Sequence, residues 1–394
     1  MSEAIVITGM GVLSPIGGDE TEFWDALVHG RRGDSPVQGL ATSELSRHIA
    51  CQIQTPLKDA PRAGRAAQLA VLAARQAIAQ ANLGSAALAD ASTFVVMGTT
   101  MGETGAIEAR LTGPNDHWLD ADHAAAIQAE SPGSLARHVQ SDVGCRGSVL
   151  DLYGACAAGN MAMTSAVRRL RSRRCDVAIC GGADGFSLLA FLGFMRLRVM
   201  AGEICRPFDQ RRDGLWVGEG AGVFVLERES TARARGALIR ARISGCATTC
   251  ETYHPTRPDP EGEGLGRATQ LALQDAMIDA RDVDYVCAHG TGTPQNDAIE
   301  VTVMDRLFPQ CVRFSSIKSL TGHTMGAAAA IEAACCVLSL QHQTLIPTWG
   351  LEQVLTPCSS QAIVGTIQPT RLRCVVNNSA GFGGYNSIIV IAAA

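Results

Sequence analysis

Among the 14 cysteines of the chain, Cys156 stands apart by its sequence context. It lies in the small-residue run Gly154–Gly159, directly before a stretch with helical character. A thiol at the N-terminus of a helix faces the positive end of the helix dipole, which should lower the thiol pKa and favour the nucleophilic thiolate. The alternative is a further core cysteine, because free cysteine often behaves as a small apolar side chain.

Two histidines lie in glycine- and threonine-rich segments at the ends of expected elements. His289 belongs to the run Ala288–Pro294 and follows an expected strand, whereas His323 belongs to the run Lys318–Thr324 and precedes an expected helix. Imidazoles at such positions are able to bind a substrate or transfer a proton. Nine histidines are present, so chance placement is the alternative, but the shared context favours a site.

The expected helix after His323 carries a single charge. Residues 325–341 are apolar on all sides apart from Glu332, which predicts a buried helix with a buried carboxylate. A buried carboxylate needs a partner, and Lys318 is the obvious candidate. The chain has only two lysines, Lys58 and Lys318, among 33 basic residues, so a lysine near His323 indicates that an arginine would not serve there. A surface lysine is the alternative.

None of the glycine-rich stretches predicts a nucleotide site. The stretches at 9–11, 218–222, 290–292 and 381–384 neither complete G-x-G-x-x-G after a strand nor carry the lysine of a phosphate-binding loop. We therefore interpret these glycines as tight turns or as places where the backbone approaches a ligand.

Short β-branched runs alternate with longer alanine-rich stretches, which predicts buried sheets covered by helices. We expect the first strand, which begins at Ile5, to end at Thr8–Gly11. Further strands are expected at 94–96, 177–180, 222–226, 239–244, 285–287, 312–314, 375–376 and 388–390, and helices at 63–82, 157–171, 265–280 and 325–341.

The two halves of the chain follow the same plan, because each has strands that end in Gly/Ser/Thr clusters beside a helix. We place the boundary after residue 235. The N-terminal half, 1–235, then carries Cys156, and the C-terminal half, 236–394, carries both histidines and the lysine. Residues 103–140 are interpreted as an inserted loop-and-helix segment that frames a site.

Composition excludes several classes of protein. The 394 residues are 46% hydrophobic and 18% charged, so the chain can bury a large core and is too apolar for disorder. A net charge of −5 predicts no nucleic-acid partner. The chain has no C-x-x-C pair and no uninterrupted 18-residue apolar run, and Met1–Glu3 begin no signal peptide. We therefore expect a cytoplasmic protein with reduced thiols and no membrane span.

Five ordered motifs together resemble the beta-ketoacyl-acyl-carrier-protein synthases, and in particular the elongating group with a Cys-His-His site. The resemblance extends from Ile7 to Asn386. It implies an α/β, thiolase-like fold with a duplicated five-layered α/β/α/β/α core, which is usually dimeric. The motifs are Gly154–Gly159, Arg206–Asp209 with Gly218–Gly222, His289–Pro294, Lys318–His323 and Asn378–Gly384.

The resemblance also implies a reaction, the decarboxylating Claisen condensation of an acyl group with malonyl-acyl carrier protein. Cys156 would carry the acyl group, and His289 and His323 would stabilise the enolate left by departing carbon dioxide. Lys318, tied to Glu332, would orient the site. The roles are chemically coherent, because a covalent intermediate divides a difficult step and preorganised N–H donors stabilise developing negative charge.

Further implied roles concern substrate binding. The backbone N–H groups of Cys156 and Phe382 would form the oxyanion hole, and Phe382 would also gate the acyl pocket. Thr291 and Thr293 would bind the phosphopantetheine arm. No metal or other cofactor is implied, because the phosphopantetheine arrives on the carrier-protein substrate.

The implied partner is an acyl carrier protein, and the implied assembly is a homodimer or a heterodimer with a chain-length-factor-like subunit. Carrier proteins are acidic, so a basic rim is expected. Arg62, Arg65 and Arg196 match the docking surface of the family, with ordinary solvated arginines as the alternative.

Four residues depart from the commonest family pattern. Gly154 stands where threonine is frequent, Ala329 replaces a glycine, Ala380 stands where phenylalanine is frequent, and Tyr385 replaces a small hydroxyl residue. Ala380 and Tyr385 change the bulk of the gating loop in opposite directions. The acyl specificity therefore stays open between primary fatty-acid synthesis and a specialised polyketide, aryl-polyene or unusual fatty-acid pathway.

Three rival classes are disfavoured. A non-condensing chain-length factor usually lacks the cysteine that is present here. A thiolase or a priming synthase does not fit the His-Gly-Thr-Gly-Thr and Lys-x-x-x-Gly-His runs. A structural or binding module leaves Glu332 in an apolar helix without an explanation.

Overall fold

The structure is a computed structural model that describes residues 3–38, 45–61, 63–90, 92–111 and 134–394. Ten strands carry the two sheets of the fold. Their bounds are β1 Ile5–Leu13, β4 Thr93–Thr99, β5 Ser148–Tyr153, β6 Val177–Asp184, β7 Gly220–Arg228, β8 Ala241–Cys250, β9 Tyr285–Cys287, β10 Arg313–Ser315, β14 Cys374–Gly381 and β15 Tyr385–Ala393. Short strands complete the set: β2 Ser35–Pro36, β3 Ile49–Ala50, β11 Thr344–Leu345, β12 Gln361–Ala362 and β13 Gln368–Pro369.

Both halves of the chain repeat one strand topology. The order across the sheet is β5-β4-β6-β7-β1 in the first half and β10-β9-β14-β15-β8 in the second, with β12 beside β10. Numbered along the chain within each half, both orders read 3-2-4-5-1, and parallel and antiparallel pairings match throughout. The sheets join where Ile5–Ile7 pairs antiparallel with Ala241–Ile243. The position of the domain boundary stays a prediction.

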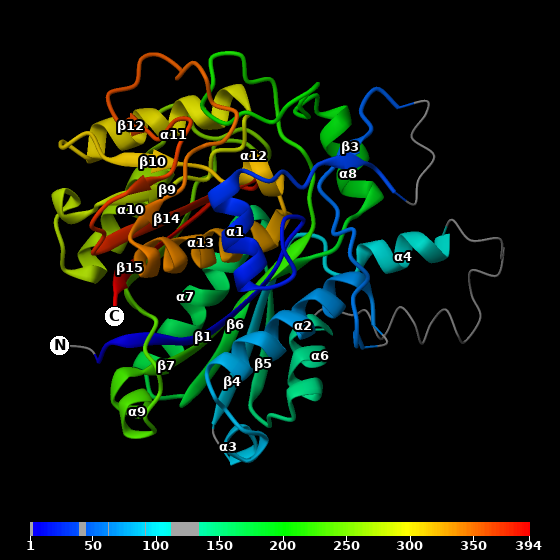
Figure 1. Cartoon of the computed structure of the whole chain (residues 1–394), viewed down its shortest axis with the longest axis vertical. Helices are drawn as coiled ribbons and strands as arrows, with labels where there is room; N and C mark the ends of the chain where they lie inside the picture. The colour runs from blue at the N-terminus through cyan, green and yellow to red at the C-terminus, as the bar shows by residue number, and fades with distance from the viewer. Residues whose placement is uncertain (1–2, 39–44, 62, 91, 112–133) are drawn as a thin grey trace.

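Helices form three layers around the two sheets (Figure 1). Two of them, α7 and α13, lie between the sheets, while α2 and α6 cover one outer face and α10 and α11 cover the other. The predicted duplicated five-layered α/β fold is therefore confirmed. The helix bounds are α1 Glu20–His29, α2 Arg65–Gln80, α3 Ser85–Asp90, α4 Thr104–Leu111, α6 Ser134–Val143, η1 Ala155–Ala157, α7 Ala158–Arg171, α8 Leu188–Arg196, α9 Glu229–Ala234, α10 Glu263–Ala276, η2 Ala280–Asp282, α11 Pro294–Leu307, α12 Lys318–Thr321, η3 Met325–Ala327 and α13 Ala328–His342.

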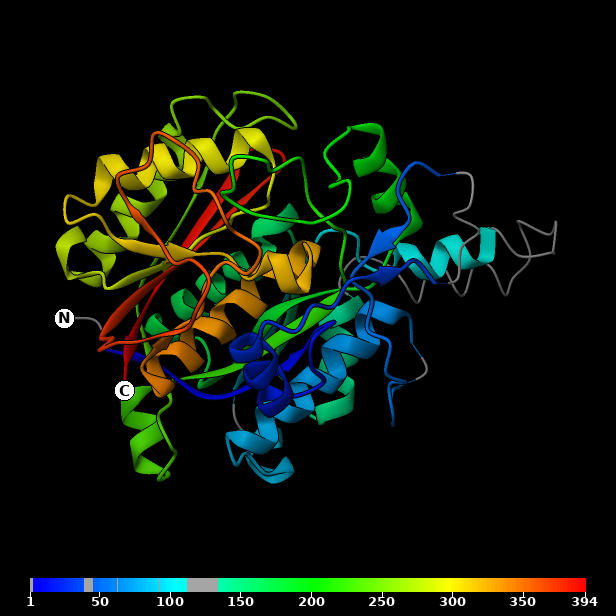
Figure 2. The same ribbon diagram turned by 45° about the horizontal axis from the view of Figure 1, so that its top comes forward.

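Helix α13 is buried along its length, as its composition predicts. The segment Met325–His342 is long and apolar enough to cross a membrane, but 89% of it is buried inside the protein. Figure 2 shows this helix enclosed between the two sheets. Burial explains the apolar sequence, so the segment is a core helix.

Some elements differ from the sequence-based expectation. The first strand continues through Gly11 to Leu13 instead of ending in a turn. A Cβ atom on Gly9 would lie 2.0 Å from the Ala77 carbonyl oxygen of α2, and one on Gly11 would lie 2.1 Å from that of Ala73. These glycines therefore permit close packing of helix on strand rather than a turn.

Several helices were not predicted, among them α1, α8 and α11. The sequence of helix α11 lacks the regular spacing of apolar residues that predicts a helix, because its buried face includes two carboxylates, Asp297 and Glu300. The proposed inserted segment, 103–140, contains α4 and α6, and its centre, 112–133, lies outside the described residues.

Candidate active site

Cys156 lies in the one-turn helix η1, between β5 and α7. The preceding residue, Ala155, has a φ of 47°, a left-handed conformation that costs free energy in a residue with a side chain. This conformation turns the chain sharply from strand into helix. The Ser379 hydroxyl donates to the Cys156 carbonyl oxygen at 3.0 Å and fixes the turn. A Cβ atom at Gly154 would lie 2.3 Å from Met161 Sδ, so a larger residue there would require the methionine side chain to move.

His323 lies at the corresponding place in the second half, just before η3 and α13. Met325 repeats the left-handed backbone of Ala155, with a φ of 58°. The His323 backbone N–H donates to the Trp216 carbonyl at 2.7 Å, and the Gly218 N–H donates to the His323 carbonyl at 2.9 Å. The glycine-rich stretch 218–222 thus begins beside the segment that holds this histidine.

His289 follows β9, in a loop whose backbone is held by two carboxylates of α11. Glu300 accepts hydrogen bonds from the N–H groups of His289, at 2.6 Å, and Gly290, at 2.8 Å. Asp297 accepts from the N–H of Thr291 at 3.0 Å. Sequence reasoning missed both acids. The sequence does contain a signal for them, because Pro294 can begin a helix and the two acidic residues follow it three positions apart.

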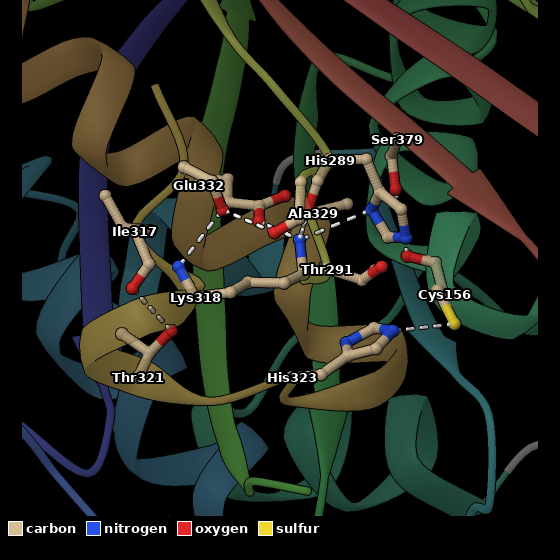
Figure 3. Close-up of polar contacts among 12 residues, drawn as sticks. Cys156, His289, Thr291, Ile317, Lys318, Thr321, His323, Ala329, Glu332 and Ser379 are labelled. Carbon is tan, nitrogen blue, oxygen red and sulfur yellow. Dashed lines mark hydrogen bonds and ion pairs between the residues drawn. The ribbon is translucent and has the colours of Figure 1, made fainter. Parts of the chain in front are cut away.

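The cysteine and the two histidines meet at one point (Figure 3). The Cys156 Sγ atom lies 3.0 Å from His323 Nε2. The rings of His289 and His323 are 5.3 Å apart and nearly perpendicular, at 82°. All three side chains are buried, with 6% of the Cys156 surface exposed. The structure therefore brings together three residues that are up to 167 positions apart in the chain.

Lys318 forms the predicted ion pair with Glu332, and both side chains are buried. The Lys318 ammonium also donates to the His289 carbonyl oxygen at 2.5 Å and lies 3.3 Å from His289 Nδ1. Because an ammonium can only donate, His289 accepts at Nδ1 and carries its proton on Nε2. These contacts converge on a single nitrogen, which suits the compact ammonium of lysine better than the planar fork of arginine.

Burial reverses the expected ionisation of the nucleophile. It raises the pKa of the Cys156 thiol to about 12, although the Lys318 ammonium and the N–H groups of Phe382 and Cys156 oppose the shift. The expected lowering of the thiol pKa is therefore wrong. Burial and the Lys318 charge also hold the pKa values of His289 and His323 well below 6.5. At neutral pH the site contains a thiol and two neutral imidazoles.

A cavity of about 450 Å³ leads to these three groups. Thr291 and Thr293 line it, with their hydroxyls 2.8 Å apart, and so does Phe382. The Phe382 ring packs on Phe194 at 5.7 Å between centroids. The N–H groups of Phe382 and Cys156 both contact the Cys156 sulfur. The positions of the predicted gate, arm-binding and oxyanion residues are thus consistent with one binding site.

The predicted docking arginines are placed differently from one another. Arg62 lies outside the described residues. Arg65 is held by the buried carboxylate of Glu219 at 2.8 Å, so its charge is already paired. Arg196 is exposed at the end of α8. Two arginines that sequence reasoning did not select, Arg198 and Arg257, are exposed and line the cavity itself.

A further missed residue is Asp184, at the end of β6. Its buried carboxylate accepts from the Thr99 hydroxyl at 2.6 Å and from the N–H groups of Met101, at 2.9 Å, and Gly326, at 2.6 Å. Burial raises its pKa to about 6, against these hydrogen bonds. Asp184 therefore ties the start of η3 to the strands beneath Cys156.

Comparisons with known proteins agree along the whole chain. Residues 2–232 match the family model "Beta-ketoacyl synthase, N-terminal domain", and residues 240–352 match "Beta-ketoacyl synthase, C-terminal domain". The "3-oxoacyl-[acyl-carrier-protein] synthase 2" of Staphylococcus aureus (strain COL) is 33% identical over 405 residues, which cover 99% of this chain and 98% of that protein.

Two further similarities are with a polyketide synthase subunit and with a solved ketosynthase structure. The "Tetracenomycin polyketide synthase ketoacyl synthase alpha subunit" of Streptomyces glaucescens is also 33% identical, over 98% of this chain and 96% of that protein. The solved structure "The ishigamide ketosynthase/chain length factor" superposes with a TM-score of 0.94 at 32% identity and covers 100% of both chains.

The high pKa of Cys156 predicts that its alkylation by iodoacetamide accelerates as the pH rises. A thiol with a pKa of about 12 gains roughly tenfold in thiolate for each pH unit below that pKa, and the thiolate is the reacting form. We expect the alkylation rate to rise throughout the range from about pH 7 to 9. Peptide mass spectrometry would measure the rate at each cysteine, with the exposed Cys250 as internal standard. A rate at Cys156 that levels off below about pH 8 would contradict the buried, neutral thiol.

Proposed function

The chain belongs to the beta-ketoacyl synthase family, and from that premise we propose that it condenses an acyl group held on Cys156 with malonyl-acyl carrier protein. Carbon dioxide is released, and the product is a 3-oxoacyl-acyl carrier protein. One observation carries the proposal, the convergence of a thiol and two neutral imidazoles at the base of a cavity of about 450 Å³.

The first step is transfer of the acyl group to Cys156. The neutral thiol needs a base, and His323 Nε2 is 3.0 Å from the sulfur. No described residue hydrogen-bonds to His323 Nδ1, so this ring is free to carry its proton on either nitrogen. His323 takes the thiol proton as sulfur attacks the thioester carbonyl, and returns it to the departing thiol of the carrier. The N–H groups of Cys156 and Phe382 stabilise the oxyanion.

The second step is loss of carbon dioxide from the malonyl thioester. The electron pair of the breaking C–C bond moves into the thioester group, and negative charge builds on the thioester oxygen. His289 carries its proton on Nε2 because Lys318 donates to Nδ1, so it is preorganised to donate to that oxygen. His323 is the second donor. The enolate carbon then attacks the acyl group, and the Cys156 sulfur leaves as a thiolate, which takes up a proton from solvent water.

These steps use side chains and backbone groups only, and the phosphopantetheine is supplied by the substrate. Thr291 and Thr293 line the cavity with paired hydroxyls, which suits them to the amides of the pantetheine arm. The relatives are, by name, a 3-oxoacyl-acyl-carrier-protein synthase and a polyketide synthase subunit, so neither one pathway nor one acyl chain is proposed. We expect the reaction to take place in the cytoplasm.

A partner subunit is proposed at the edge of the first sheet. Strand β5 has no neighbour on its outer side among the described residues, and Leu150 and Tyr153 on it are 39% and 47% exposed. Open strand edges with apolar side chains are sites of chain pairing. A second copy of this chain, or a chain-length-factor-like subunit as in the superposed complex, would cover this edge.

Intact-protein mass spectrometry tests the proposed reaction. We expect the wild-type protein to gain an acyl mass from at least one member of a panel of acyl carrier thioesters, and to release carbon dioxide when malonyl carrier protein follows. Cys156→Ala should gain no acyl mass. Failure of every acyl donor with the wild type would refute the synthase proposal, and acylation without condensation would favour the non-condensing partner subunit.

Glu300 is expected to support decarboxylation by positioning His289. In Glu300→Gln the amide has only one acceptor oxygen for the two N–H groups that Glu300 binds, and its NH₂ group faces a donor. We expect the rate of carbon dioxide release to fall roughly 100-fold, the scale of a small misplacement of a reacting group. Acylation of Cys156 should continue. The control Glu261→Gln changes an exposed carboxylate and should leave both steps unchanged. Equal loss in both steps would indicate general damage instead.

The cavity mouth, rather than Arg65, is the proposed contact with the acidic carrier. Arg198 and Arg257 are exposed there. We expect Arg198→Glu to raise the KM for the carrier substrate and to make it less sensitive to salt, with Cys156 alkylation unchanged. Steady-state kinetics at two salt concentrations would measure this. Arg174→Glu, an exposed arginine at the far end of α7, is the control. An unchanged KM for Arg198→Glu would contradict docking of the carrier at the cavity mouth.

A further inference from the structure

We propose that Cys156, His289 and His323 also form a binding site for a soft divalent cation, Zn²⁺ in particular, which holds the protein in a state without a free nucleophile. The site would be inhibitory, because the metal takes the sulfur that the acyl group needs. It is an addition to the condensing reaction, whose steps use no metal.

The geometry is close to that of a zinc site. One ligand atom from each of the three residues lies within 4.8 Å of the other two, and Cys156 Sγ and His323 Nε2 are already 3.0 Å apart. With Zn–S of about 2.3 Å and Zn–N of about 2.0 Å, ligands on a tetrahedral zinc lie roughly 3.3 to 3.6 Å from one another. Side-chain movements of a fraction of an ångström to about 1 Å therefore suffice. The fourth position faces the cavity, where a water molecule can complete the shell.

The ligand types select the cation. One thiolate and two imidazoles are the soft and borderline donors that favour zinc, whereas Mg²⁺ prefers oxygen. The site is buried, so competition from solvent is low. On binding, the thiol proton of Cys156 passes to bulk water, and the ring proton of His289 moves from Nε2 to Nδ1, which displaces the Lys318 ammonium from that nitrogen. Figure 3 shows the Cys156 sulfur and the two rings turned toward a common point.

Lys318 is the group that opposes the metal. Its ammonium contacts His289 Nδ1 and so keeps the proton on the nitrogen that must coordinate. Glu332 forms an ion pair with this ammonium and partly offsets its charge. The Lys318 charge is therefore expected to affect the two functions in opposite directions. Removal of the Lys318 charge weakens the condensing reaction and strengthens metal binding.

Cobalt substitution tests the proposal without any acyl substrate. Co²⁺ is the probe, because it shows a sulfur-to-metal charge-transfer band and tetrahedral visible bands when it replaces zinc. We expect one Co²⁺ per chain with these bands in the wild type, displacement by Zn²⁺, and no displacement by Mg²⁺. The band should disappear in Cys156→Ala, and the affinity should fall by at least a factor on the order of 100 in His323→Ala.

A second measurement follows the thiol directly. At free Zn²⁺ of about ten times its Kd, roughly a tenth of the sites remain open, so iodoacetamide should label Cys156 roughly tenfold more slowly. Labelling of a protein already alkylated at Cys156 gives the background of the other cysteines. Cys250→Ala is the matched control, because Cys250 is exposed beside the acidic residues Glu251, Asp259 and Glu263 and is the natural competing ligand.

Several outcomes would overturn the proposal. A cobalt–sulfur band that persists in Cys156→Ala and disappears in Cys250→Ala would show that the metal binds at the surface cysteine instead. An absence of the cobalt–sulfur band in folded wild-type protein would refute the proposed metal site. Lys318→Gln, if folded by circular dichroism, should bind Co²⁺ more tightly, and weaker binding would contradict the charge argument. Because no thioester enters these experiments, their failure leaves the condensing reaction untouched, and a failure of condensation leaves the metal site untouched.

Discussion

The close contact between the two central helices is the constraint on which the site depends. A Cβ atom on Gly159 of α7 would lie 2.9 Å from the Ala330 nitrogen of α13, and one on Gly222 of β7 would lie 2.7 Å from the Ala330 carbonyl carbon. Residues with no side chain therefore let both helices sit between two sheets at minimal separation. Because Cys156 precedes one helix and His323 precedes the other, this packing is what sets the distance between sulfur and imidazole.

The repeated topology divides the chemistry between equivalent places. The third strand of each half leads through a left-handed residue into a central helix, and these two turns supply Cys156 and His323. The second strand of the second half leads to His289. The carboxylates that hold these turns, Asp184, Glu300 and Glu332, are all buried and all bonded to backbone N–H groups or to Lys318. The fold thus uses buried acids mainly as fixed anchors.

Much of this arrangement could be predicted from the sequence. Cys156, the two histidines and the Lys318–Glu332 pair are legible because each lies in a local run whose composition is unusual, and α13 because it has no polar face. The ionisation of Cys156 could not be predicted. Its position at a helix start is visible in the local sequence, but the burial that raises its pKa depends on how both halves of the chain pack around it. The pairing of Arg65 could not be predicted for the same reason, because Glu219, its partner, is 154 positions away. Asp297 and Glu300 were missed because a buried face with carboxylates breaks the apolar pattern of a helix.

The contact between Asp184 and Gly326 also limits how the two halves can change. Gly326 is the second residue of η3, as Cys156 is the second residue of η1, so the two occupy matching places in the repeat. A Cβ atom on Gly326 would lie 2.7 Å from Asp184 Oδ2 and 2.7 Å from the Thr100 nitrogen. A second thiol at this position would therefore require Asp184 and the backbone at Thr99 and Thr100 to shift. The packing thus favours a single thiol at the two matching turns, so the duplicated fold keeps one nucleophile instead of two.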